Sequence, residues 1–292
     1  MSLSDKLLEK SNSYNYYKTK YEKFAKDNKK LKEKIMSLEK SNSEYEEEIA
    51  SLKERILETE EHTKNLTNEI HYAFVFNDTI RGSKWLKETN FSLINASANY
   101  SLMYYIYRVL DEVNPKNILE LGLGQTTRLT SQYANYFNDV KLTVIEEDEQ
   151  WIKTFSDNIS LNDNIKIVQR DIEEFEFDGS INLRFKDFSE VTGNEKYDLV
   201  IIDAPHGYIK KNGVTKVLDY SRSNVWQLIP DNLAENFAII MDDYERQGEQ
   251  NTMEHVKKLL KENGIYFFKH SHHGLKFQHA VFSRDYKFLA WY

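Results

Sequence analysis

The 292-residue sequence has no cysteine, only three prolines and ten glycines, and no long apolar run. The lack of cysteine excludes disulfide bonds and thiolate metal sites, and it fits a reducing compartment. No segment approaches the roughly 18 apolar residues that a membrane-spanning helix needs. Residues Met1 to Lys6 have no apolar core of the kind found in secretory signals. We therefore expect a cytoplasmic protein without a membrane span.

Basic residues are outnumbered by acidic ones. The chain has 47 acidic and 39 basic side chains, for a formal net charge of −8. This balance does not indicate a basic surface for nucleic acid, so we expect no nucleic-acid partner. The scarcity of glycine and proline argues against extensive disorder. The length leaves room for one α/β domain of about 200 residues and an additional segment.

The first 70 residues predict a coiled coil. From Tyr14 to Ile70 there is no glycine or proline, and the apolar residues follow a seven-residue repeat. This repeat is typical of a left-handed coiled coil, and Ile at a with Leu at d favours a parallel homodimer in which Asn28 and Asn42 fix the register. The alternative is a single solvated helix that folds back on the domain. The a positions are Tyr14, Tyr21, Asn28, Ile35, Asn42, Ile49, Ile56, Thr63 and Ile70, and the d positions are Tyr17, Phe24, Leu31, Leu38, Tyr45, Leu52, Thr59 and Leu66.

Residues 71–92 lose the repeat and contain Gly82 and Ser83, so we predict a linker there. It would join the coiled coil of residues 1–70 to a domain of residues 93–292. An amphipathic helix is expected from Phe91 to Val113. It should end there because proline disfavours helix in the residue before it, and Pro115 follows closely.

A glycine loop follows the first predicted strand of the domain, Ile118 to Leu121. Gly122 and Gly124 allow a tight turn and let a ligand lie against main-chain N–H groups. Glu120 suits a cationic or hydroxyl-rich ligand better than a pyrophosphate, which favours S-adenosylmethionine (SAM) over NAD. An ordinary strand-to-helix turn is the alternative interpretation.

Acidic residues close the next strands. Glu146 follows the strand 141–145, where an acid accepts hydrogen bonds from ribose hydroxyls in nucleotide-binding α/β folds. Asp203 follows the buried strand 197–202, and Asp242 and Asp243 follow the strand 236–241. If these strands are neighbours, the three aspartates converge, and hard oxygen ligands suit Mg²⁺ or Mn²⁺. Such acids also commonly cap the helices that follow strands.

This order of motifs resembles the class I SAM-dependent methyltransferases over residues 85–292. The resemblance implies a Rossmann-like sheet of seven strands whose last strand is antiparallel. It implies SAM as cofactor and assigns its binding to Glu120, Gly122, Gly124, Thr126 (where the family has a third glycine), Glu146 and Asp203.

Two groups within that class are most similar. An acid after the fourth strand, a base three residues later and an acid pair after the fifth strand resemble the catechol-type and macrolide-sugar O-methyltransferases. There the acids hold a divalent metal, which implies Asp203, Asp242 and Asp243 as ligands. His206 takes the place of the base, so that the implied catalytic residues are His206, Asp203 and Asp243.

The second group is the glucuronoxylan 4-O-methyltransferases and their polysaccharide-locus relatives. The resemblance lies in the acids 146–148, the run 203–208, Arg222 and the run 243–249. It implies O-methylation of a sugar or glycan hydroxyl in capsular or exopolysaccharide modification. Arg222 and Arg246 could bind a substrate carboxylate or phosphate, or form ion pairs within the protein.

Three histidines, His270, His272 and His273, lie between strand-like runs at 265–268 and 279–282. We expect them in the turn of a hairpin formed by strands six and seven, although they could also bind a metal or shape a substrate entrance. Other functions left open are a non-catalytic coiled-coil scaffold and a methyltransferase for another small molecule. Glu120 and the missing third glycine count against an NAD-dependent oxidoreductase.

Overall fold

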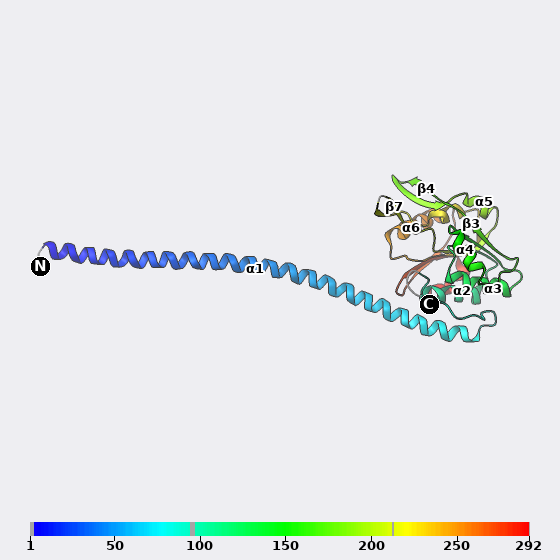
Figure 1. The fold of residues 1–292 in the computed structure, drawn as a ribbon, viewed down its shortest axis with the longest axis horizontal. Helices are drawn as coiled ribbons and strands as arrows, with labels where there is room; N and C mark the ends of the chain where they lie inside the picture. Colours follow the sequence, from blue (N-terminus) through cyan, green and yellow to red (C-terminus); the bar gives the residue numbers. More distant parts are fainter. Residues whose placement is uncertain (1–2, 94–96, 212, 292) are drawn as a thin grey trace. The chain divides into compact units, whose positions relative to one another are not determined.

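The computed structural model describes residues 3–93, 97–211 and 213–291, with side chains described from residue 11 onward. The chain divides into two compact units, Met1–Glu61 and His62–Tyr292. The elements are labelled in Figure 1. The helices are α1 (Leu3–Thr79), α2 (Tyr100–Val113), α3 (Gln125–Tyr136), α4 (Glu149–Ser156), α5 (Phe188–Thr192) and α6 (Gln247–Glu262), with 3-10 helices η1 (Ile80–Gly82), η2 (Ser223–Leu228) and η3 (Arg284–Trp291). The strands are β1 (Asn117–Leu121), β2 (Lys141–Glu146), β3 (Ile165–Gln169), β4 (Ile172–Phe177), β5 (Ser180–Phe185), β6 (Tyr197–Ile202), β7 (Tyr208–Lys211), β8 (Val214–Val217), β9 (Leu233–Met241), β10 (Phe268–His273) and β11 (Phe277–Phe282).

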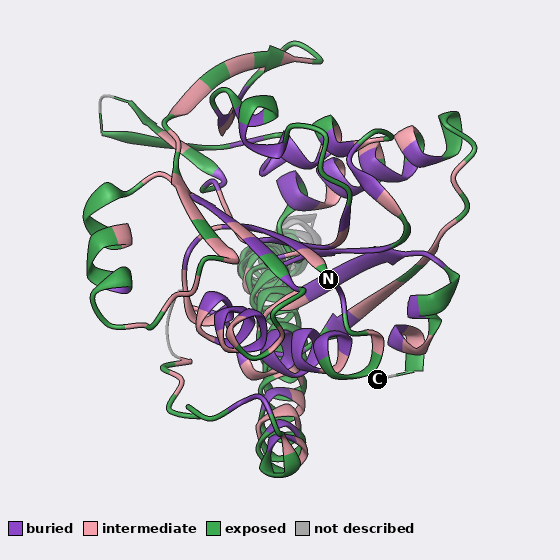
Figure 2. Cartoon of the chain, turned by 90° about the vertical axis from the view of Figure 1, so that its right-hand side faces the viewer, coloured by how far each residue is buried: buried purple, intermediate pink, exposed green. Residues whose placement is uncertain are grey.

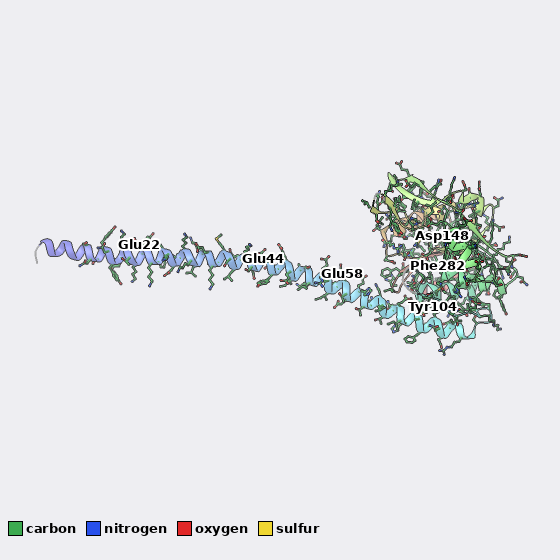
Figure 3. All side chains as sticks on the ribbon, viewed as in Figure 1. Glu22, Glu44, Glu58, Tyr104, Asp148 and Phe282 are labelled. Carbon is green, nitrogen blue, oxygen red and sulfur yellow. The ribbon has the colours of Figure 1, made fainter. Side chains whose placement is uncertain are left out.

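Helix α1 is one uninterrupted helix of 77 residues. In the first unit almost every described side chain is exposed, including the apolar residues of the seven-residue repeat. Glu22, Glu44 and Glu58 mark this stretch in Figure 3. The helix agrees with the sequence pattern, and its pairing with a second copy stays a prediction. Within the described ranges no helix has both the length and the apolar character needed to cross a bilayer.

The predicted linker of residues 71–92 is mostly not a linker. The helix continues past Ile70 to Thr79, and Tyr72 and Phe76 pack against the core of the second unit. The ring centroid of Phe76 lies 6.3 Å from that of Tyr107 on α2. Beyond Ile70 the seven-residue repeat is replaced by the pair Tyr72 and Phe76, which pack against the rings of α2. Residues 62–79 therefore belong to the domain.

A seven-stranded sheet forms the centre of the domain, in the order β10-β11-β9-β6-β1-β2-β3. Strands β1, β2, β3, β6 and β9 pair in parallel, while β11 runs antiparallel to both of its neighbours. This is the predicted sheet. Two antiparallel strand pairs in the described residues lie outside this sheet, β4–β5 and β7–β8.

Alternation along the buried strands divides the core into two layers. In β6, Leu199 and Ile201 pack with α2 and α3, while Val200 and Ile202 pack with α6 on the opposite face. Because helices cover both faces, these strands are apolar along nearly their whole length. Figure 2 shows the buried residues gathered along the sheet and on the helix faces turned toward it.

Two further predictions differ from the structure. Helix α2 begins at Tyr100, because Asn99 caps it by accepting a hydrogen bond from the Leu102 N–H; the expected start at Phe91 is wrong. The three histidines lie in β10 itself and not in the hairpin turn, which is formed by residues 274–276. His272 is buried because it faces the ring of Tyr105, at a centroid distance of 4.0 Å.

The docking of α1 can be tested with two phenylalanines one half-turn apart. Phe76 is 1% exposed and Phe74 is 71% exposed. Phe76→Ala is expected to lower the free energy of unfolding by about 3–5 kcal/mol, because it opens a cavity in the core. Phe74→Ala should change it by less than about 0.5 kcal/mol. Urea unfolding followed by tryptophan fluorescence measures both, and equal effects would contradict the docking of residues 62–79.

Candidate functional site

The glycine loop after β1 passes close to the segment that follows β6. Gly122 has φ of 102°, and a Cβ placed there would lie 3.1 Å from the Cβ of Ala204. Gly124 precedes α3, and an added Cβ there would meet no atom within 4 Å. The loop is thus tight at Gly122 and open at Gly124, beside the N-terminus of a helix.

Glu146 ties the loops after β1 and β2 together. Its carboxylate accepts hydrogen bonds from the N–H groups of Leu123 (2.9 Å), Glu147 (2.9 Å) and Asp148 (3.1 Å). The indole N–H of Trp151 donates to the Leu123 carbonyl at 2.8 Å. Since each carboxylate oxygen has two lone pairs, Glu146 retains capacity for one ligand hydroxyl.

Glu120 is fully buried behind the loop. It accepts hydrogen bonds from the hydroxyls of Thr126 and Thr130, both on α3. Burial raises the pKa of Glu120 to about 7, against the lowering effect of these hydroxyls. The structure therefore places Glu120 and Thr126 in contact with each other, where they support the loop from inside.

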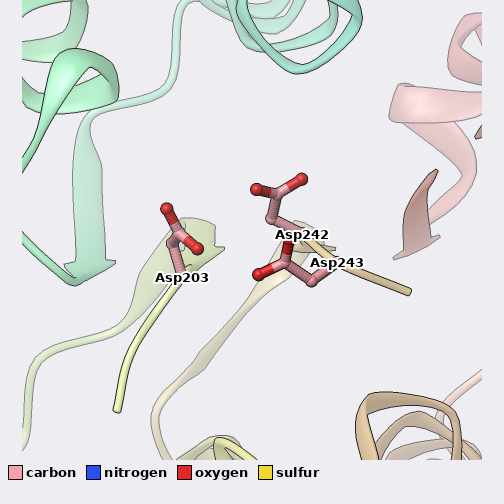
Figure 4. A group of neighbouring side chains, drawn as sticks. All are labelled: Asp203, Asp242 and Asp243. Carbon is pink, nitrogen blue, oxygen red and sulfur yellow. The ribbon is translucent and has the colours of Figure 1, made fainter. Parts of the chain in front are cut away.

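Asp203, Asp242 and Asp243 come together at the carboxyl ends of the adjacent strands β6 and β9, and we call them the acid cluster (Figure 4). One carboxylate oxygen from each lies within 4.8 Å of the others. This spacing alone would suit a metal ion. Asp242 and Asp243 are buried, so their charges require partners.

Three cationic side chains supply those partners. Arg222 Nη2 lies 3.1 Å from Asp203 Oδ1 and 2.5 Å from Asp243 Oδ2. Lys276 Nζ lies 3.3 Å from Asp242 Oδ2 and 3.2 Å from Asp243 Oδ1. Arg246 Nη1 lies 3.0 Å from Asp243 Oδ2.

These contacts decide the charge states of the cluster. Burial raises the pKa of Asp203 to about 7, although Arg222 opposes the rise. Burial also acts to raise the pKa of Asp243, but the cations Arg222 and Lys276 outweigh it and the pKa is lowered. The pKa of Lys276 is raised, because Asp242 and the other aspartates outweigh the effect of burial. Lys276 therefore stays an ammonium ion.

Of the two arginines considered for substrate binding, Arg222 is committed to the protein. It is 3% exposed, and its guanidinium also donates to the carbonyl of Asp242 at 2.9 Å. Its ion pairs with Asp203, Asp243 and Glu249 are those that the ion-pair interpretation expects of a side chain paired within the protein. The side chain of Arg246 is 46% exposed, so that part of it is accessible to solvent.

His206 lies outside the acid cluster's ion pairs. Its Nδ1 is 3.4 Å from Glu147 Oε1, and its side chain is 40% exposed. A carboxylate in this position orients the imidazole ring. Glu147 belongs to the motif at 146–148, but we did not predict it as a site residue. Lys276 and Gln278 were also missed, since no motif marks either.

A buried chain of hydrogen bonds joins α1 to the acid cluster. Glu69 accepts a hydrogen bond from Asn99 Nδ2 at 2.8 Å. Gln278 Nε2 lies 3.1 Å from Asn99 Oδ1 and 2.9 Å from Asp242 Oδ1, and both contacts are hydrogen bonds. Glu69 also accepts from the backbone N–H of Leu275, in the turn that carries Lys276. The end of α1 is therefore part of the framework of the site.

Comparison with known proteins gives the following matches. Residues 98–206 match the family described as ribosomal RNA adenine dimethylase. No curated protein matches the chain. An O-methyltransferase from Bacillus cereus in complex with SAH is similar in structure at 15% identity and a TM-score of 0.41, over 74% of this chain and 91% of that one. A precorrin-6y C5,15-methyltransferase from Geobacter metallireducens is similar at 10% identity and a TM-score of 0.41, over 68% of this chain and 97% of that one.

The fold is that of the class I SAM-dependent methyltransferases. Seven strands in this order, with β11 antiparallel among parallel neighbours, are the sheet expected from the sequence. The family match ends at His206, so it covers the glycine loop and Glu146 but neither Asp242 nor Lys276.

The buried Glu120 predicts a specific dependence of stability on pH. A carboxyl whose pKa rises on folding contributes stability that is present below its unfolded pKa, 4.5, and is lost as pH rises through about 7. The melting temperature should therefore fall between pH 5 and pH 8 because of this group. In Glu120→Gln the melting temperature should fall less over this pH range. Part of the fall should remain, because the pKa of Asp203 is also raised in the folded protein. Scanning calorimetry across this range measures the slope, and an unchanged slope in the variant would refute the assignment.

Proposed function

We propose that this protein is a SAM-dependent O-methyltransferase that methylates a hydroxyl of a sugar or glycan, in polysaccharide modification. One observation carries the proposal. The glycine loop, Glu146, the acid cluster and the His206–Glu147 pair all stand at the carboxyl ends of β1, β2, β6 and β9. Ligands of open α/β sheets bind at this edge.

The residues present suit SAM. The open side of Gly124 at the start of α3 leaves room for a ligand against main-chain N–H groups. Glu146 can accept a ribose hydroxyl while it holds the loop. The carboxylates at this edge suit a sulfonium cation. When bound, SAM supplies an electrophilic methyl group, whose bond to sulfur breaks as its bond to the acceptor oxygen forms, leaving S-adenosylhomocysteine.

His206 is proposed as the general base. Its Nε2 would take the proton of the acceptor hydroxyl during transfer, and Glu147 would stabilise the imidazolium that forms. The proton then passes to water. The rest of the catalytic effect would come from orientation, since fixing the two reactants can contribute about 7–11 kcal/mol. Divalent metal is not part of this scheme, because the chain's own cations contact the acid cluster.

The sugar acceptor is supported by the motif series and by Arg246. The half-exposed guanidinium of Arg246 could bind the carboxylate of an acidic sugar through two parallel hydrogen bonds. The match of residues 98–206 to an rRNA adenine dimethylase family favours a second candidate, N-methylation of adenine in RNA. The net charge of −8 counts against that acceptor, because phosphate backbones attract basic surfaces.

Binding of SAM or S-adenosylhomocysteine by calorimetry tests the proposal first. Isotope from labelled SAM should then appear in a polysaccharide acceptor; label found in RNA instead would favour the second candidate. His206→Ala is expected to lower kcat by about 10²–10⁴-fold with S-adenosylhomocysteine affinity unchanged, because only proton transfer is lost. His62→Ala, on an exposed part of α1, is the control. No cofactor binding would refute the enzyme and favour a scaffold function.

We further propose that α1 forms a parallel homodimer through its seven-residue repeat. Ile35 and Ile49, at a positions, are 50% and 51% exposed in the single chain. Large apolar side chains in such a regular seam are stabilised by a second helix.

Light scattering should therefore give a dimer for the full chain and a monomer for the double variant Ile35→Lys and Ile49→Lys. The double variant Glu33→Lys and Glu47→Lys adds the same number of lysines at f positions, away from the seam, and should remain a dimer. A monomeric full-length chain would rule out the coiled coil.

A further inference from the structure

The acid cluster contains its own cation. Lys276 lies in the turn between β10 and β11, and its ammonium contacts one oxygen of Asp242 and one of Asp243. These are two of the three carboxylates that would otherwise serve as metal ligands. A divalent ion held by the same oxygens would need the space that the Lys276 ammonium fills.

Arg222 is a second buried cation in contact with the acid cluster. It bridges Asp203 and Asp243, and it is fixed by hydrogen bonds to the carbonyls of Asp242 and Ile202. A guanidinium does not lose its proton in a protein, so this positive charge is permanent. Gln278 donates a hydrogen bond to Oδ1 of Asp242, the oxygen that Lys276 does not contact. At least five of the six carboxylate oxygens of the cluster thus contact a nitrogen donor.

The charges are nearly balanced without a metal. Glu249 joins the three aspartates, at 3.6 Å from Arg222 Nε and 3.8 Å from Arg246 Nη1. Four carboxyl groups therefore face three cations, Arg222, Arg246 and Lys276. A divalent ion would add two positive charges next to a buried guanidinium, and that repulsion is strong where water does not screen it.

We propose that the ammonium of Lys276 occupies the cation position of this cluster and excludes divalent metal from it. The Lys276 side chain also lines a hollow of about 380 Å³ together with Ile70, Ala73 and Leu93. Lys276 thus contacts the acid cluster and also borders this hollow. If the chain transfers methyl groups as proposed above, the ammonium donates a hydrogen bond to the acceptor oxygen. This last step rests on the proposed function, whereas the exclusion of metal does not.

Manganese binding tests the exclusion directly, without turnover. The full chain and its variants are titrated with Mn²⁺, and free ion is followed by electron paramagnetic resonance. The wild-type chain should bind no Mn²⁺ at the cluster. Lys276→Met should gain one Mn²⁺ site per chain, with an affinity at least about a hundredfold above the detection limit of the wild-type titration, since one adjacent positive charge is removed. Adding Asp242→Asn should abolish the gained site.

Two controls separate charge from damage to the fold. Lys276→Arg keeps a cation and should bind no Mn²⁺, and Lys258→Met removes an exposed lysine on α6 and should behave as the wild type. Melting temperatures show that each variant is folded.

The proposal is overturned if the wild-type chain binds Mn²⁺ at a site that Asp242→Asn removes, or if folded Lys276→Met gains no site. S-adenosylhomocysteine binding, measured separately, shows whether the enzyme proposal has failed instead. If both proposals hold, chelation of metal by EDTA leaves the transfer rate unchanged.

Discussion

The buried guanidinium of Arg222 is the interaction on which the rest of the site depends. A buried charge is stable only with close partners, and Arg222 finds them in Asp203 after β6 and Asp243 after β9. It therefore fixes the ends of two adjacent strands to each other. Gly207 lies next to a third acid of this network: a Cβ there would lie 3.1 Å from Glu249 Oε1, which is 3.6 Å from Arg222 Nε.

The same edge of the sheet is connected to the long helix. Glu69 lies near the end of α1, and the hydrogen bonds through Asn99 and Gln278 reach Asp242. Gly274 allows this approach, since a Cβ there would lie 2.8 Å from the Cβ of Ser101. The last turns of α1 thus serve two roles, because they continue the helix of the first unit and also stabilise the turn that holds Lys276 beside the acids.

The candidate site consists of a proposed cofactor half and a proposed acceptor half. The cofactor half is built from short-range elements, a strand, a loop and a helix start, and the family match covers it. The acceptor half brings together residues from β6, β9, the β10–β11 turn and α1, which lie far apart in the sequence. The cations beside the acid cluster are the observation behind the proposal that internal ion pairs, and not a metal ion, neutralise these acids.

Local patterns in the sequence determined the sheet, the long helix and the positions of Glu146, Asp203, Asp242 and Asp243 at strand ends. They could do so because buried parallel strands are continuous apolar runs and the residues after them lie at one edge. Only the tertiary structure decided that α1 continues to Thr79, that Arg222 is buried and that Lys276 reaches the acids. Lys276 is 33 and 34 residues from its partners, and Glu69 is 206 residues from Leu275. Contacts at such separations follow no periodicity along the chain, since they are set by how strands and helices pack.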